Sequence, residues 1–72
     1  MAQARTTKGT PDLTYNMVSV IYHALQGAET YGQYASDALE AENKELARFF
    51  RDIQRDNLKR ADKAKGLLKP LL

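Results

Sequence analysis

Residues 13–28 read Leu-Thr-Tyr-Asn-Met-Val-Ser-Val-Ile-Tyr-His-Ala-Leu-Gln-Gly-Ala and contain no formally charged side chain. The run stands out because 28% of the 72 residues of this chain are charged. A helix with one solvated face usually carries charges on that face. We therefore expect a helix that is covered on more than one side. One hairpin of 72 residues cannot supply that cover, so we expect a partner chain to supply it.

Apolar residues recur through this segment and beyond it at alternating steps of four and three residues. Such a seam is typical of helices that pack at a shallow angle. Its members are Met17, Ile21, Ala24, Ala28, Tyr31, Ala35 and Ala38. Thr10-Pro11-Asp12 precedes the seam as an N-cap, a first helical proline and a first-turn acid, which predicts a helix over about 12–41. Residues 1–9 lack an apolar period and are expected to form a disordered tail.

A second amphipathic segment follows a turn that we predict at residues 40–43, with Asn43 as the N-cap. We expect Gly66 to cap a helix over about 44–65 and Pro70 to prevent its continuation. The expected apolar stripe contains Leu46, Phe50, Ile53, Asn57, Ala61, Ala64 and Leu68, with Phe49 and Leu67 at its flank. The predicted fold is all-α: residues 10–72 form one domain, an antiparallel two-helix hairpin, and two hairpins dimerise into a four-helix bundle.

The composition limits how so short a chain can be stabilised. Small scaffolds usually add disulfides, a metal or oligomerisation to their core. The chain has no Cys, which excludes disulfides and Cys-based zinc sites, and leaves assembly or a metal held by oxygen ligands and the single His. We see no signal-peptide pattern and no transmembrane run, so we expect no membrane partner and a cytoplasmic location.

Charge is divided unevenly along the chain. Residues 10–43 carry five acidic and no basic residues, whereas residues 44–72 carry nine basic and four acidic residues. The two halves are therefore complementary, within one chain or between chains. Asp52, Asp56 and Asp62 interrupt the basic stripe of the second helix, which indicates a solvated face with local ion pairs more than a nucleic-acid site.

Three polar residues fall on or near the predicted apolar surfaces. Asn57 lies in the middle of the stripe of the second helix, Arg60 lies at its edge, and Glu29 flanks the seam of the first helix. A buried polar side chain needs a hydrogen-bonding partner, so we expect these residues to contact one another or a facing chain. The sequence leaves open whether this buried polar cluster sets the register and oligomeric state or forms a functional pocket.

The stretch from Glu45 to Leu68 resembles the second helix of ferritin-like and rubrerythrin-like proteins. The similarity lies in Glu45-Leu46, the pair Phe49-Phe50, and Arg60-Ala61-Asp62-Lys63, where bacterioferritin-like chains read His-Ala-Asp-Lys. Glu29-Thr30-Tyr31 and Tyr34-Ala35 are similar to the first helix of the same half-bundle. The resemblance covers about residues 15–68 and implies a ferritin-like helical hairpin.

The metal ligands of that family do not carry over to this chain. Its di-iron site uses a Glu from one helix and a Glu-x-x-His motif from the next. Here Asn57-Leu58-Lys59-Arg60 fills the position of the motif, and Ala24 falls at the position of the first-helix Glu. Arg60 keeps its positive charge and would repel a cation. The candidates for a rearranged site are Glu29, His23, Asp52 and Asp56.

No catalytic or cofactor-binding residue is assigned, because the chain has no Cys, one His and no Gly-rich loop. The expected function is that of a small non-enzymatic ferritin-like structural or interaction protein that is homo-oligomeric. Two alternatives stay open. One is a metal-binding protein of the di-iron type, holding iron or another divalent metal at a rearranged site around Glu29. The other is a basic helical module that binds an acidic partner.

Overall fold

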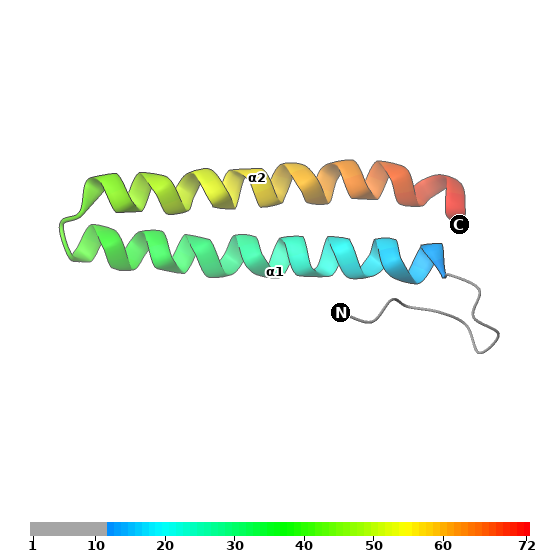
Figure 1. Ribbon diagram of the computed structural model, residues 1–72, viewed down its shortest axis with the longest axis horizontal. Coiled ribbons are helices and arrows are strands. Elements are labelled where there is room, and N and C mark those ends of the chain that lie inside the picture. The colour runs from blue at the N-terminus through cyan, green and yellow to red at the C-terminus, as the bar shows by residue number, and fades with distance from the viewer. Residues whose placement is uncertain (1–11) are drawn as a thin grey trace.

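The computed structural model describes residues 12–72, which form two long antiparallel helices side by side (Figure 1). Helix α1 spans Leu13–Glu40, helix α2 spans Lys44–Leu68, and a short 3-10 helix, η1, spans Lys69–Leu71. The predicted all-α hairpin is confirmed. The expected tail over residues 1–9, and the expected roles of Thr10 and Pro11, lie outside the described residues.

Helix α1 begins at Leu13, one residue after its predicted start at about residue 12. Asp12 has extended backbone angles, and its carboxylate accepts a hydrogen bond of 2.9 Å from the backbone N–H of Tyr15. Asp12 is therefore the N-cap, and its prediction as a first-turn acid was wrong. The physical reason is that a short carboxylate at this position satisfies a backbone N–H that has no partner within the helix.

The turn between the helices satisfies the last carbonyls of α1 in a Schellman arrangement. The N–H of Asn43 donates to the carbonyl of Ala38 at 2.9 Å, and the N–H of Glu42 donates to that of Leu39 at 2.9 Å. Glu42 adopts a φ of 61°, the left-handed conformation that this position requires. Asn43 is the N-cap of α2, as predicted, because its side chain accepts from the N–H of Leu46 at 3.0 Å.

Helix α2 does not end at Gly66, so the prediction of a glycine cap was wrong. The helix continues through Gly66 to Leu68, and the N–H of Lys69 still donates to the carbonyl of Lys65. Pro70 lies in the first turn of η1. A backbone N–H at this position has no partner within the helix, so a proline costs no hydrogen bond there. Helix α2 therefore passes into the tighter 3-10 turn of η1 where we expected the helix to end.

The core of the hairpin is made of alanine alone. Every alanine of α1 and α2 is buried, and no other residue among the described ones is. The seven are Ala24, Ala28, Ala35, Ala38, Ala47, Ala61 and Ala64. Because alanine is small, the two helix axes can approach toward the short end of the usual range of about 8–10 Å.

The predicted seam of α1 is confirmed, since its four alanines are buried and Met17, Ile21 and Tyr31 are half-buried. The predicted stripe of α2 is confirmed from Phe50 to Leu68, where every member, Ile53 included, is buried or half-buried, and it was wrong at its first residue. Leu46 is 41% exposed, and the seam instead runs through Ala47, Phe50, Gln54, Asn57, Ala61, Ala64 and Leu68. A polar residue, Gln54, takes a seam position because its side chain finds a backbone partner on α1.

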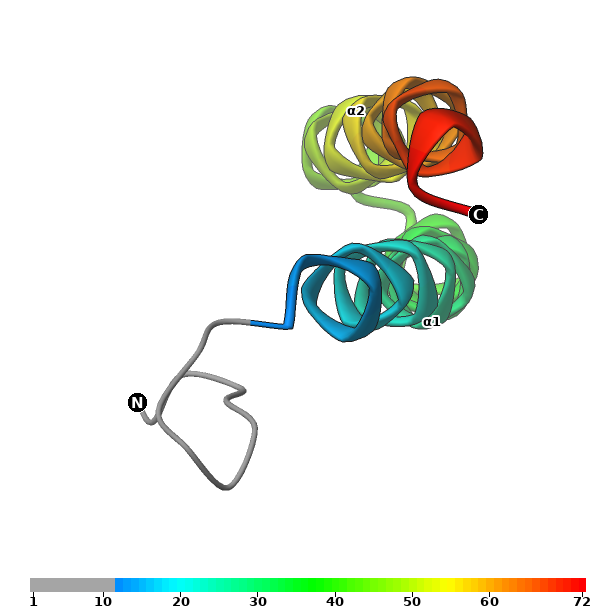
Figure 2. The same ribbon diagram turned by 90° about the vertical axis from the view of Figure 1, so that its right-hand side faces the viewer.

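The two helices form a single layer, as the end-on view shows (Figure 2). The described part of the chain extends 52 Å along the helices and 24 Å across them, but only 12 Å in the third direction. Each helix is therefore covered on one side only, by the other helix. The hairpin has two broad faces, and neither face is covered by another element of residues 12–72.

Candidate interaction surfaces

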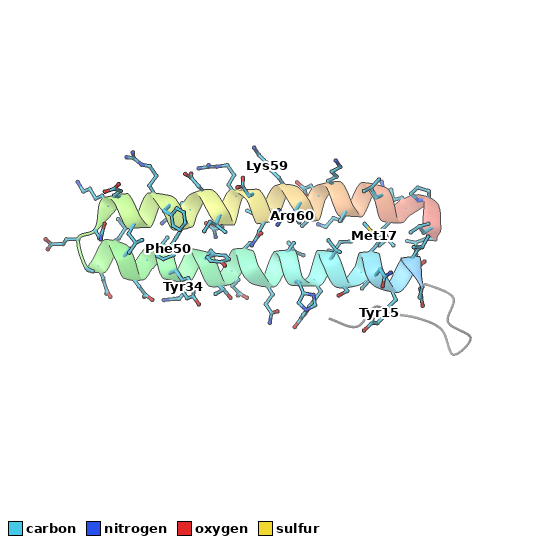
Figure 3. The ribbon with its side chains drawn as sticks, in the orientation of Figure 1. Tyr15, Met17, Tyr34, Phe50, Lys59 and Arg60 are labelled. Carbon is cyan, nitrogen blue, oxygen red and sulfur yellow. The ribbon has the colours of Figure 1, made fainter. Side chains whose placement is uncertain are left out.

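The middle of the hairpin contains a polar contact between the helices. A Cβ atom built on Gly27 of α1 would lie 2.6 Å from the Nδ2 atom of Asn57, so the amide occupies the space that a side chain would need. On the other side of the amide, the Nη1 atom of Arg60 donates to the Oδ1 atom of Asn57 at 3.1 Å. Arg60 lies between the helices in Figure 3. The structure thus brings Asn57 and Arg60 together, with Gly27 as the third member.

Glu29 does not join this contact within one chain. It is exposed, and about 100° of rotation per residue places it on the flank of α1 opposite to Gly27. Arg60 is also exposed and Asn57 is half-buried. Among residues 12–72 no polar or charged side chain is buried. The hairpin alone therefore does not bury the expected cluster of Glu29, Asn57 and Arg60.

A second amide contact was missed by the sequence analysis. The Nε2 atom of Gln54 donates to the carbonyl of Ala28 at 3.0 Å. A Cβ atom on Gly32 would lie 2.5 Å from that nitrogen. The signal that could have found Gln54 is its spacing, because it stands four residues after Phe50 and three before Asn57.

Aromatic side chains gather near the turn. Tyr34 lies beside Phe50, with ring centroids 5.4 Å apart, and Phe49 lies 5.8 Å from Phe50 (Figure 3). Tyr31 contacts Tyr34 edge to face at 5.5 Å. The cluster is only partly covered, because Phe49 is 58% exposed. Exposed aromatic groups of this kind are common at protein interfaces.

The exposed residues of each helix fall on two flanks of the alanine seam. Because the helices are antiparallel, equivalent flanks lie side by side and together form the two broad faces of the hairpin. The contact of Tyr34 with the Phe49–Phe50 pair marks one face. The contact of Gln54 with Gly32 lies toward the other face.

We call the first of these the neutral face. Its exposed apolar residues are Leu13, Val20, Tyr34, Leu46, Phe49 and Leu67. The polar contact of Gly27, Asn57 and Arg60 lies at its centre. Its charges balance, because Asp37 and Asp56 stand against Arg60 and Lys63.

We call the second the basic face. It carries an apolar set, of which most belongs to α1: Tyr15, Val18, Tyr22, Leu25, Leu39 and Leu58. Its basic residues all belong to α2 and η1 and are all exposed: Lys44, Arg48, Arg51, Arg55, Lys65 and Lys69. Glu29 and Asp62 oppose them on this face and Asp52 pairs with Arg55 from the outer edge of α2, so a net positive charge remains.

The candidate metal ligands do not converge. His23 bonds within its own helix, with its Nδ1 atom 2.9 Å from the carbonyl oxygen of Ser19. Asp52 forms a salt bridge of 2.9 Å with Arg55. Across the part of the chain that the structure describes, no group of three His, Asp or Glu side chains is placed to hold a metal ion.

Comparison with known proteins adds no assignment, since no protein family, no curated protein and no solved structure matches this chain. Within residues 12–72, neither helix is apolar enough over a sufficient length to cross a lipid bilayer. The function is therefore argued from the two faces alone.

Proposed function

We propose that this chain is a small, non-enzymatic structural or interaction protein that works as a homodimer. In this proposal, two hairpins pack face to face into a four-helix bundle of the ferritin-like kind. The observation that carries the proposal is the contrast between core and surface. The hairpin buries only alanines, while large apolar side chains such as Leu13, Phe49 and Leu67 are more than half exposed. Apolar surface of this extent is typical of interaction sites.

The neutral face is the better candidate for self-association. A two-fold symmetric interface brings the same patch of both chains together. Pairing two basic faces would therefore place twelve basic side chains in one interface, opposed by Glu29, Asp62 and the Asp52 that pairs with Arg55 in each chain. Two neutral faces carry balanced charges and meet without that repulsion. One flank of the uncharged segment of α1, with Leu13 and Val20, then enters the interface, which accounts for the lack of charges on that flank.

The dimensions of the hairpin also suit this assembly. A standard interface buries about 800 Å² on each partner, and a face that extends 52 by 24 Å is large enough to supply this area. In the dimer, Asn57 and Arg60 meet the second chain as a polar pair within an apolar surface. A single polar position of this kind is a known determinant of register and oligomeric state in helical bundles.

The test is the mass of the protein in solution, measured by light scattering and sedimentation over a range of concentrations. We expect twice the chain mass of 8.1 kDa. Phe49→Glu should weaken the dimer, because it adds one negative charge per chain to an interface of balanced charge. Tyr22→Glu is the matched control, since Tyr22 is exposed to 59% on the basic face and Phe49 to 58% on the neutral face.

If a variant both dissociates and unfolds, the melting temperature of the wild-type protein still tests whether it is a dimer. The melting temperature of a dimer rises with protein concentration, whereas that of a monomer does not. A wild-type melting temperature independent of concentration, together with a monomeric mass, would overturn the proposal. Dissociation by Tyr22→Glu but not by Phe49→Glu would overturn the choice of face.

A further inference from the structure

The basic face has a feature that self-association through the neutral face does not use. All six basic residues of this face come from α2 and η1, and α1 contributes none. Arg55 is paired with Asp52. The other five form no salt bridge among the residues described. Positive side chains without partners create a field that attracts a ligand of opposite charge.

An apolar row runs along the same face. Val18, Leu25 and Leu39 of α1 are between 40% and 49% exposed. They stand at multiples of seven residues, so they lie in line along about 32 Å of the helix. Gly32 occupies the third position of this row, between Leu25 and Leu39, and adds no apolar side chain there. Leu58 extends the apolar surface onto α2.

We propose that the basic face binds an acidic amphipathic helix of another protein. The apolar row lies beside the seam on α1 and Leu58 lies beside it on α2, so exposed apolar groups stand on both sides of the line where the helices meet, which we call the valley. The partner helix lies in this valley and covers the row with its own leucines, as in other helix-in-groove complexes. Its acidic flank lies over α2 and pairs with Lys44, Arg48 and Arg51.

The surface fits a helix better than a nucleic acid or a lipid bilayer. A phosphate backbone pairs with the basic residues but leaves the row of Val18, Leu25 and Leu39 without an apolar partner. A flat bilayer would meet the outer residues of this face, and on α2 and η1 these include the exposed Arg48, Arg55 and Lys69 rather than apolar groups. A helix reaches both the valley and the charged flank.

The inference goes beyond the proposed homodimer and is tested with a defined probe. The probe is a fluorescent peptide of about 21 residues, long enough to match the apolar row, with leucine at the first and fourth positions of each heptad and glutamate on one flank. A twin peptide carries lysine in place of every glutamate. We expect the acidic peptide to bind, its affinity to fall with salt, and the lysine twin to bind at least tenfold more weakly.

A matched pair of variants locates the binding site. Arg51→Glu reverses a charge beside the valley, whereas Lys59→Glu reverses a charge on the outer edge of the same helix, where Lys59 points away from α1 (Figure 3). We expect Arg51→Glu to weaken binding of the acidic peptide about tenfold or more. Lys59→Glu should change the affinity less than threefold. Leu25→Ser should also weaken binding, because it removes apolar contact.

Equal binding of the two peptides, no binding of either, or equal effects of Arg51→Glu and Lys59→Glu would overturn the inference. Duplex DNA and phosphatidylserine vesicles serve as competing ligands, and tighter binding of either one than of the peptide would also overturn it. The mass of Arg51→Glu is measured in parallel. If the acidic peptide fails to bind the wild-type protein while the wild-type mass is that of a dimer, the inference fails and the proposed homodimer stands.

Discussion

The Nδ2 atom of Asn57 occupies the space above Gly27 where any other residue would place its Cβ atom, at a separation of 2.6 Å. The two residues therefore depend on each other across the helix interface. A glycine in the middle of α1 costs about 1 kcal/mol relative to alanine, and the contact explains why this position carries one. The short side chain of Asn57 is held in turn by the guanidinium of Arg60.

This dependence predicts strong coupling between substitutions at the two positions. Asn57→Ala removes the obstructing amide, so in that background Gly27→Ala should stabilise the protein by about 1 kcal/mol. With Asn57 present, the new methyl group must displace the amide, and Gly27→Ala should give no gain or a loss. The measurement is a double-mutant cycle by urea unfolding at one protein concentration.

Gly66 provides the control for that cycle. It also lies within a helix, but a Cβ atom there would have no neighbour within 4 Å. Gly66→Ala should stabilise the protein by up to about 1 kcal/mol whether or not Asn57 is present. Additive effects of Gly27→Ala and Asn57→Ala would show that the contact does not constrain Gly27.

The alanine core predicts a strict limit on side-chain size. Ala61 is fully buried between the helices, and Ala61→Leu should force the helices apart and destabilise the protein by about 1–3 kcal/mol. Gln26→Leu adds a leucine on the exposed face of α1 and should change the stability by less than about 0.5 kcal/mol. Thermal unfolding of both variants checks this, and similar melting temperatures would contradict the packing described above.

The turn predicts a stabilising substitution. Glu42 holds a φ of 61°, which is strained for a residue with a Cβ atom and relaxed for glycine. Glu42→Gly should therefore stabilise the protein by about 1 kcal/mol. Glu40→Gly, two residues earlier and inside α1, should instead destabilise it by about 1 kcal/mol. Opposite signs in chemical denaturation support the turn geometry, and a loss of stability in both variants would refute it.

The dispersed acidic residues predict how the protein responds to metal removal. Glu29 and Asp62 are the acidic residues of the basic face and lie on different helices, and Asp52 is paired with Arg55. Treatment with a chelator should therefore leave the melting temperature unchanged, because among residues 12–72 no three His, Asp or Glu side chains are placed to hold an ion whose binding would add to the folding energy. Elemental analysis of protein expressed with added iron is the direct check. Near-stoichiometric iron, or a fall in melting temperature with chelator, would restore the di-iron alternative around Glu29.

The sequence predicted α1 better than α2 for a physical reason. On α1 the apolar residues recur in strict steps of four and three, so the period alone identifies the buried side. On α2 the apolar residues Leu46 and Ile53 sit one residue before the seam positions Ala47 and Gln54. Reading hydrophobicity alone therefore included the exposed Leu46 and missed Ala47 and Gln54, while the rest of the predicted stripe is buried or half-buried.

The polar contacts were predicted in part. We expect Asn57 and Arg60 to contact each other, Glu29 or a facing chain because a buried polar side chain needs a partner, and their spacing of three residues on one helix allows the contact that forms. On α1, Gln54 contacts the carbonyl of Ala28 and Asn57 fills the space above Gly27. Both contacts depend on the axial alignment of the two helices. That alignment follows from the length of the turn and from close packing, and neither leaves a pattern in the sequence.

The two amide contacts have a mechanical consequence for the hairpin. An alanine seam is nearly smooth and offers little resistance if one helix rolls about its own axis. Asn57 fits against Gly27 on one flank of α1, and Gln54 fits against Gly32 on the other, so α1 is gripped from both sides. These two contacts oppose rotation of α1 about its own axis in either direction. They thereby keep the side of excess positive charge and the side of balanced charge apart, which a smooth seam alone would not do.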